Sequence, residues 1–261
     1  MHRPAASRLR LLSAGLVVAL FVALVAVLAV ATPRSHLVPP PRSDVALFLR
    51  SQGDSGTCAV VVWLHVRYAR PGIDLVVVPP DVLVQSSGAP AVPLHSVIEQ
   101  QGPAAGARAL SALLGVSIGG WASLNMDPVL QSMGMTTLAA ALTADNKGGG
   151  RPLTAAEYDR QVGLLRAAAV LAPRKVLPVP TVENYVFGSG KVATSLGIND
   201  VAWVARAMRE AAAGDVAVLA LPARVAVTSG GPLWRVDAAG VAALVRELRR
   251  RPTAPAVSGG R

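Results

Sequence analysis

The hydrophobic positions of the chain fall into one long apolar run and a series of shorter ones. Residues 11–31, LLSAGLVVALFVALVAVLAVA, form a stretch of 21 residues without a charge, and about 20 apolar residues are enough for a helix to cross a bilayer. Arg3, Arg8 and Arg10 precede the run, so the positive-inside rule predicts that residues 1–10 stay in the cytoplasm. We therefore predict a transmembrane helix at 11–31 of a single-pass cell-membrane protein whose main part lies outside the cytoplasm.

A cleaved signal peptide is the alternative for the same segment. Residues 29–31 read Ala-Val-Ala, which is an A-x-A cleavage site ending at Ala31. The apolar run is longer than the core of about 7–15 residues that is typical of signal peptides, which favours an uncleaved anchor. Both alternatives place the rest of the chain outside the cytoplasm, so we expect no nucleic-acid partner.

After a proline-rich spacer at 32–43, shorter hydrophobic runs show strand and helix patterns. Nearly continuous β-branched runs predict buried strands, and the Pro-Gly pair between two of them predicts a hairpin. Runs with helical spacing predict helices that begin at capping residues and end at glycines. The predicted strands are residues 45–49, 59–66, 73–78, 116–124 and 216–221, and the predicted helices are residues 103–114, 154–171, 201–213 and 238–250.

The clearest helix start is the pair Thr154 and Glu157, which has the spacing of a capping box. Strands and helices mixed around one core predict an α/β fold, and we expect a three-layer αβα sandwich with a mixed central sheet. The predicted extracytoplasmic domain covers residues 44–251, and the tail at 252–261 is expected to be disordered.

Composition limits the chemistry of this domain. The chain is 52% hydrophobic, which excludes a disordered protein. Taking the three N-terminal arginines from 25 basic residues leaves 22 against 15 acidic ones, a balance that suits anionic partners. The single cysteine, Cys58, excludes an intramolecular disulfide and is expected to be a buried apolar residue. Trp234 stands beside a Gly-Gly-Pro turn, so we expect its ring to be exposed.

Common catalytic motifs are absent from the sequence. It contains no G-x-S-x-G, P-loop or H-E-x-x-H pattern. The histidines are scattered, and neither His65 nor His95 is expected to form a Ser-His-Asp triad.

Four stretches, read in order, resemble the extracytoplasmic LytR–CpsA–Psr family, which attaches glycopolymers to cell walls. The first is a strand and turn, LVVVPPDVLV, and the second a Gly-Pro helix followed by a strand that ends on Asn, HSVIEQQGPAAGARALSALLGVSIGGWASLN. The third is a helix that begins Arg-Gln, DRQVGLLRAAAV, and the fourth ends in a Leu-Pro strand, KVATSLGINDVAWVARAMREAAAGDVAVLALPAR. The resemblance covers residues 45–224, and the collinear order of the stretches carries it.

The resemblance implies a ligand, a reaction and a site. The ligand is a polyprenyl-phosphate-linked glycan with its lipid tail in an apolar pocket, and the reaction is a phosphotransfer from this glycan to peptidoglycan. Arginines and Mg²⁺ hold the pyrophosphate. Asp81 matches the acid of a Pro-Arg-Asp turn and is expected as a catalytic residue and magnesium ligand. Arg160 is expected as a second catalytic residue, with Gln161 and Arg151 binding substrate.

The chain departs from the family pattern at two cationic positions. Pro80 stands where the turn has its arginine, and Glu157 stands one turn before Arg160 where another arginine is expected. Loss of one such preorganised group costs about 10²–10³ in rate. We therefore expect weakened or lost phosphotransferase activity, as in a pseudoenzyme that still binds the lipid-linked glycan. The alternative is an inactive accessory or interaction protein of the cell envelope with no lipid ligand.

Overall fold

A computed structural model of the protein describes residues 43–50, 58–67, 72–85, 90–125, 152–171, 192–197, 200, 207, 215–228 and 231–250. The predicted transmembrane helix, the tail, and most of the predicted spacer and of the predicted helix at 201–213 lie outside these ranges. Within them, no helix combines the length and the apolar character needed to cross a membrane.

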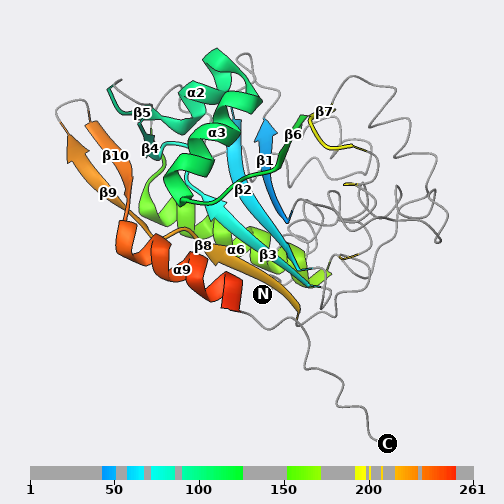
Figure 1. Ribbon diagram of the computed structural model, residues 1–261. Coiled ribbons are helices and arrows are strands. Elements are labelled where there is room, and N and C mark those ends of the chain that lie inside the picture. The colour runs from blue at the N-terminus through cyan, green and yellow to red at the C-terminus, as the bar shows by residue number, and fades with distance from the viewer. Residues whose placement is uncertain are drawn as a thin grey trace, which may run out of the picture.

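A six-stranded sheet forms the centre of the described fold, with the strand order β7-β6-β1-β2-β3-β8 (Figure 1). Its antiparallel centre consists of β1 (Asp44–Arg50), β2 (Cys58–Arg67) and β3 (Gly72–Val78). β6 (Gly120–Asn125) runs parallel to β1, and β8 (Val216–Ala220) runs parallel to β3. β7 (Val192–Thr194) adds an antiparallel edge beside β6. The predicted mixed sheet and the predicted β2–β3 hairpin are confirmed.

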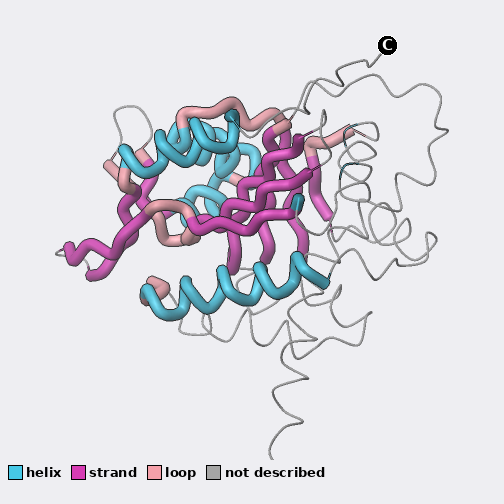
Figure 2. The backbone as a smooth tube through the Cα atoms, turned by 90° about the horizontal axis from the view of Figure 1, so that it is seen from below, coloured by secondary structure: helices cyan, strands magenta, loops and turns pink. Residues whose placement is uncertain are grey.

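Helices cover both faces of this sheet. α2 (Leu94–Gln101), α3 (Pro103–Leu114) and α9 (Ala238–Arg250) lie on one side, and α6 (Ala155–Leu171) lies on the other (Figure 2). Because β2 and β3 are covered on both faces, nearly all of their residues are buried, as their continuous apolar runs predict. The described part of the chain therefore has three αβα layers.

Capping residues set the helix ends as the sequence predicts. α3 ends at Gly115, whose φ of 64° is left-handed and therefore favours glycine. The capping box of α6 is formed: the Thr154 amide donates to Glu157 Oε2 at 2.7 Å, and the Glu157 amide donates to Thr154 Oγ1 at 3.3 Å. Asp237 caps α9 by accepting a hydrogen bond from the Ala239 amide at 3.1 Å.

One strand begins later than predicted, and several described elements, β7 among them, were not predicted. The strand predicted from residue 116 begins only at Gly120, because Ser111 Oγ donates to the Val116 carbonyl and ties the preceding segment to α3. The short α2 was not predicted. Neither was the pair of two-residue strands β4 (Leu83–Val84) and β5 (Val92–Pro93), nor the hairpin of β9 (Ala223–Thr228) and β10 (Gly231–Val236).

The expectation that Trp234 is exposed is wrong. Its ring lies in the β9–β10 hairpin with only 3% of its surface exposed. Trp234 Nε1 donates to the Leu153 carbonyl at 2.8 Å, and the ring packs against Tyr158 with a centroid distance of 4.9 Å. Trp234 therefore joins the hairpin to the start of α6.

Candidate functional site

Asp81 lies in the turn that ends β3, where two prolines stop the strand. Prolines have no amide hydrogen and fix φ, so they cannot continue a central strand. The Val82 amide closes the turn on the Pro79 carbonyl at 3.1 Å, and the Pro80 carbonyl accepts from the His95 amide at 2.8 Å. The turn thus lies against the start of α2.

The Asp81 carboxylate has a partner for each oxygen. Oδ2 accepts a hydrogen bond from the Leu153 amide at 2.7 Å, and Oδ1 lies 3.0 Å from His95 Nδ1, at an angle outside ideal hydrogen-bond geometry. Asp81 is only 8% exposed. It therefore connects the end of β3 to the start of α2 and to the residue before the α6 capping box.

His95 is oriented by this carboxylate. The Asp81 carboxylate favours the imidazolium form, so the pKa of His95 is raised, although partial burial opposes the shift. Its other ring nitrogen, Nε2, lies 3.2 Å from Ser96 Oγ. Ser96, His95 and Asp81 thus lie in a hydroxyl–imidazole–carboxylate series that was not predicted. A half-buried imidazole in this position can carry positive charge or exchange a proton at Nε2.

Three further polar side chains lie at the same end of the sheet. β1 and β3 run in the same direction, so Arg50 ends its strand at the edge where Asp81 lies. Cys58 is the register partner of Arg50, and its amide lies 3.4 Å from Glu99 Oε1. Burial raises the pKa of the Cys58 thiol to about 12, and the nearby Asp81 and Glu99 carboxylates also raise it while Arg50 opposes them. Cys58 is a buried free cysteine, as predicted.

α6 presents the other two predicted residues in different environments. Arg160 lies on the exposed face of the helix, whereas Gln161 is only 1% exposed. Both amide atoms of Gln161 are buried without a hydrogen-bond partner among the described residues. Arg166 reaches the Val218 carbonyl of β8 at 3.2 Å, so helical geometry turns Gln161 toward the flank of α6 that faces away from β8.

The structure ties Asp81 to the start of α6 and places Arg160 further along the same helix. Asp81 is fixed to Leu153 at the start of α6, while Arg160 lies seven residues further along, or about 10 Å at 1.5 Å per residue. Arg151 lies outside the described residues. Arg50, His95 and Glu99 were not predicted as site residues. The predicted strand at 45–49 ends beside Arg50, but no predicted element contained His95 or Glu99, because α2 was not predicted.

Among the described residues, no set of ligands for magnesium is assembled around Asp81. Mg²⁺ is held by oxygen ligands in near-octahedral geometry, but both Asp81 oxygens already have partners. Within the described ranges, no three His, Cys, Asp or Glu side chains lie close enough to hold a metal ion. Magnesium stays a prediction, and no step proposed below depends on it.

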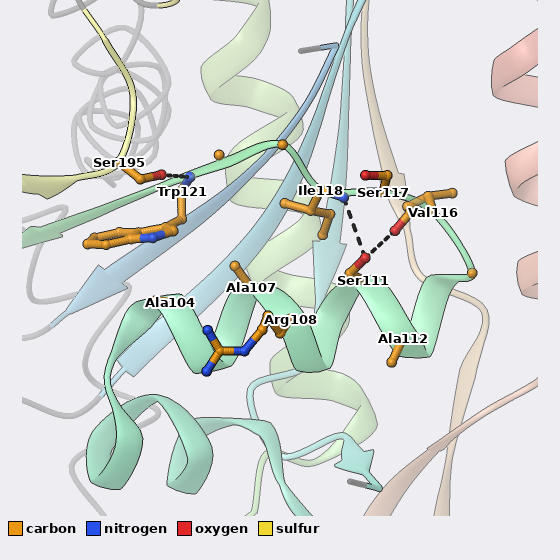
Figure 3. Close-up of a pocket in the computed structure, with 13 residues that line it drawn as sticks. Ala104, Ala107, Arg108, Ser111, Ala112, Val116, Ser117, Ile118, Trp121 and Ser195 are labelled. Atoms are coloured by element: carbon orange, nitrogen blue, oxygen red, sulfur yellow. Dashed lines mark hydrogen bonds between the residues drawn. The ribbon is translucent and has the colours of Figure 1, made fainter. Parts of the chain in front are cut away.

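A groove of about 690 Å³ lies at the opposite end of the sheet (Figure 3). Small residues of α3 form one wall, and the segment that leads into β6 forms the other, with Arg108 and Trp121 at the rim. Gly120 pairs with Val45 at the start of β1, so the wall that leads into β6 begins at the end of β1 opposite Arg50. An apolar cavity beside Asp81 stays a prediction.

Comparisons with known proteins support the fold alone. No family model matches the chain, and no curated protein matches it in sequence. Among solved structures, B. subtilis TagV has a TM-score of 0.59 and 11% identity, covering 80% of this chain and 97% of TagV. TagT bound to LIIa-WTA has a TM-score of 0.56 and 11% identity, covering 83% and 93%. An Enterococcus faecalis protein described as a transcriptional regulator has a TM-score of 0.59 and 13% identity, covering 79% and 87%.

TagV and TagT are LytR–CpsA–Psr proteins. The mixed sheet, the helices on both of its faces and these structural matches together show that this chain has the LytR–CpsA–Psr fold.

Proposed function

We propose that the protein binds a polyprenyl-phosphate-linked glycan outside the cell and takes part in attaching glycopolymers to the cell wall, with weakened or lost phosphotransferase activity. The observation that carries the proposal is the amide of Gln161, which is buried without a partner among the described residues. A buried unpaired amide is costly, and a polar ligand that hydrogen-bonds it recovers that cost. The resemblance implies that substrate binds at this residue, and TagT, which has a similar fold, has been solved with LIIa-WTA.

The charges at the Asp81 end of the sheet support a reduced activity. A pyrophosphate needs cations, and arginine matches its oxygens best. Arg50 and His95 bring positive charge to this end, but Asp81 and Glu99 offset it. Pro80 supplies no charge and no donor. Because each missing preorganised group costs about 10²–10³ in rate, we propose that transfer is slow or absent.

The transfer itself would follow the chemistry of a phosphate ester. The oxygen of a peptidoglycan hydroxyl would bond to the glycan phosphorus, the P–O bond to polyprenyl phosphate would break, and the hydroxyl proton would leave to solvent or a nearby base. Positioning and charge stabilisation supply most of the catalysis in such a step. A site that lacks some of the cationic side chains can therefore still bind the lipid-linked glycan without catalysing the transfer.

Membrane anchoring belongs to the same proposal. A polyprenyl chain keeps the donor in the bilayer, so a protein that binds its phosphate works at the membrane surface. A transmembrane helix at 11–31, with residues 1–10 in the cytoplasm, would hold the domain there.

The test is to purify the full chain in mild detergent and to identify bound lipid by mass spectrometry. We expect a polyprenyl phosphate to co-purify, and to be lost in Gln161→Leu but kept in Gln101→Leu, which removes an exposed amide. Incubation with a lipid-linked glycan and peptidoglycan should give little or no transfer. Absence of lipid from the wild type, with no binding of added polyprenyl phosphate, would favour the alternative of an accessory protein without a lipid ligand.

A further inference from the structure

Two arginines face each other on the β9–β10 hairpin. Arg224 and Arg235 are register partners in this antiparallel pair, and both are exposed. Side chains directly opposite in such a pair have Cβ atoms about 4.5–5.5 Å apart, and two like charges there destabilise the hairpin. The positions therefore place two guanidinium groups beside each other at a cost in stability.

The described residues offer these guanidinium groups no acidic partner. Neither arginine forms an ion pair with them. The nearest carboxylate along the chain, Asp237, accepts the Ala239 amide at 3.1 Å as the cap of α9. The side chains on the same face of the hairpin, Ala226 and Leu233, are apolar. An anion between the two arginines would relieve their repulsion.

The hairpin lies beside the candidate site. Trp234 forms a parallel bridge with Val82, the residue after Asp81. Trp234 Nε1 also donates to the carbonyl of Leu153, whose amide donates to Asp81 at 2.7 Å. Because side chains alternate along a strand, Arg235 points to the face opposite the buried Trp234. The pair of arginines thus lies on the surface next to the Asp81 end of the sheet.

We propose that Arg224 and Arg235 together bind one phosphate group of an anionic glycopolymer that extends from the Asp81 end of the sheet. Arginine forks pair bidentately with phosphate oxygens, and two opposed forks match the oxygens of one phosphate. The identity of the polymer rests on the proposed function. The phosphate contact rests on the arginine pair alone.

The first experiment measures binding of a short synthetic glycerol-phosphodiester oligomer to the full chain in detergent by calorimetry. We expect the double variant Arg224→Gln/Arg235→Gln to bind the oligomer at least about tenfold more weakly. It loses hydrogen bonds between charged groups, which are stronger than those between neutral groups. The control, Arg246→Gln/Arg249→Gln, removes the same charge from the exposed face of α9 and should bind like the wild type. If both double variants lose the same affinity for the oligomer, the attraction is unspecific and the proposal is wrong. The proposal is also wrong if neither variant loses affinity.

A second arm separates the two sources of phosphate. Phosphatidylglycerol vesicles replace the oligomer and should bind the arginine variant and the wild type equally. If only vesicle binding depends on the pair, the ligand is a lipid head group and the glycopolymer proposal is wrong.

A third variant separates binding from folding. Arg235→Glu places opposite charges across the hairpin, so the unfolding temperature should rise while oligomer binding falls. If the unfolding temperature and the oligomer affinity both fell, Arg235 would stabilise the hairpin rather than bind a ligand. The oligomer carries no lipid and Gln101 is an exposed residue of α2, so Gln101→Leu should leave oligomer binding unchanged. If the wild type binds the oligomer but no polyprenyl phosphate, the proposed function is wrong and the phosphate contact at the arginine pair still stands.

Discussion

Removing the Asp81 carboxylate tests whether this residue holds three elements together. The hydrogen bond from the Leu153 amide to Asp81 is short and charge-assisted, at 2.7 Å, and such bonds contribute about 1.5–3 kcal/mol. The contact with the partly exposed His95 adds about 0.5–1 kcal/mol after solvent screening. We therefore expect Asp81→Ala to lower the free energy of unfolding by about 2–4 kcal/mol. Asp81→Asn keeps an acceptor oxygen, so we expect it to lose only about 1–2 kcal/mol.

The effect of Asp81→Asn should depend on pH. The pKa of His95 is raised in the folded protein, chiefly by Asp81. A group with a raised pKa contributes its full stability below its unfolded pKa, about 6.5, and loses it as the pH rises through the folded pKa. The gap in unfolding free energy between wild type and Asp81→Asn should therefore be larger near pH 6 than near pH 9.

Chemical denaturation of the full chain, followed by tryptophan fluorescence across that pH range, measures this gap. His95→Gln serves as the partner variant, because it removes the imidazole charge and should abolish the pH dependence while Asp81 remains. A gap that does not change with pH, or a loss below about 0.5 kcal/mol in Asp81→Ala, would refute the reasoning.

Three other substitutions test neighbouring parts of the account. Tyr158→Phe should cost about 1–2 kcal/mol, because the buried hydroxyl donates to the Val77 carbonyl at 2.8 Å and accepts the Leu221 amide at 2.9 Å; an unchanged denaturation midpoint would contradict this. Thr154→Ala should cost about 1 kcal/mol through the lost capping box, and helix content measured near the midpoint should fall; equal stability would mean that the cap adds nothing. Gln161→Leu should stabilise the ligand-free protein by about 1 kcal/mol, because it removes an unsatisfied buried amide; a lower unfolding temperature would show that the amide has a partner.

Local signals fixed much of the central fold in advance. The continuous apolar runs of β1, β2 and β3 leave few alternatives to buried strands. The capping box at Thr154 and the left-handed Gly115 mark helix ends through contacts within a few residues. Such short-range contacts can be recognised without the fold.

The missed elements depend on contacts that are distant in sequence. The β9–β10 hairpin gave no continuous apolar run, and buried Trp234 contacts Leu153, which precedes α6, and Tyr158, which lies in α6. A turn next to a tryptophan predicts an exposed ring, because the sequence does not show which distant segment packs against it. Tertiary packing thus overrode the local pattern.

The position of Asp81 could be predicted from the sequence, but the residues that contact it could not. That Asp81 ends a buried strand follows from the two prolines before it. Its contacts with His95 and Leu153 join three separate elements, and no spacing in the sequence signals them. The different burial of Arg160 and Gln161 follows from helical geometry, but only once one face of α6 is known to pack on the sheet.

The most direct test of the central claim is equilibrium binding of a polyprenyl phosphate to the full chain in detergent, measured by native mass spectrometry. We expect one bound lipid per chain. Gln101→Leu, which changes an exposed residue, should keep it, and Gln161→Leu should lose it or bind it much more weakly. Absence of binding to the wild type, or equal binding by both variants, would contradict this expectation.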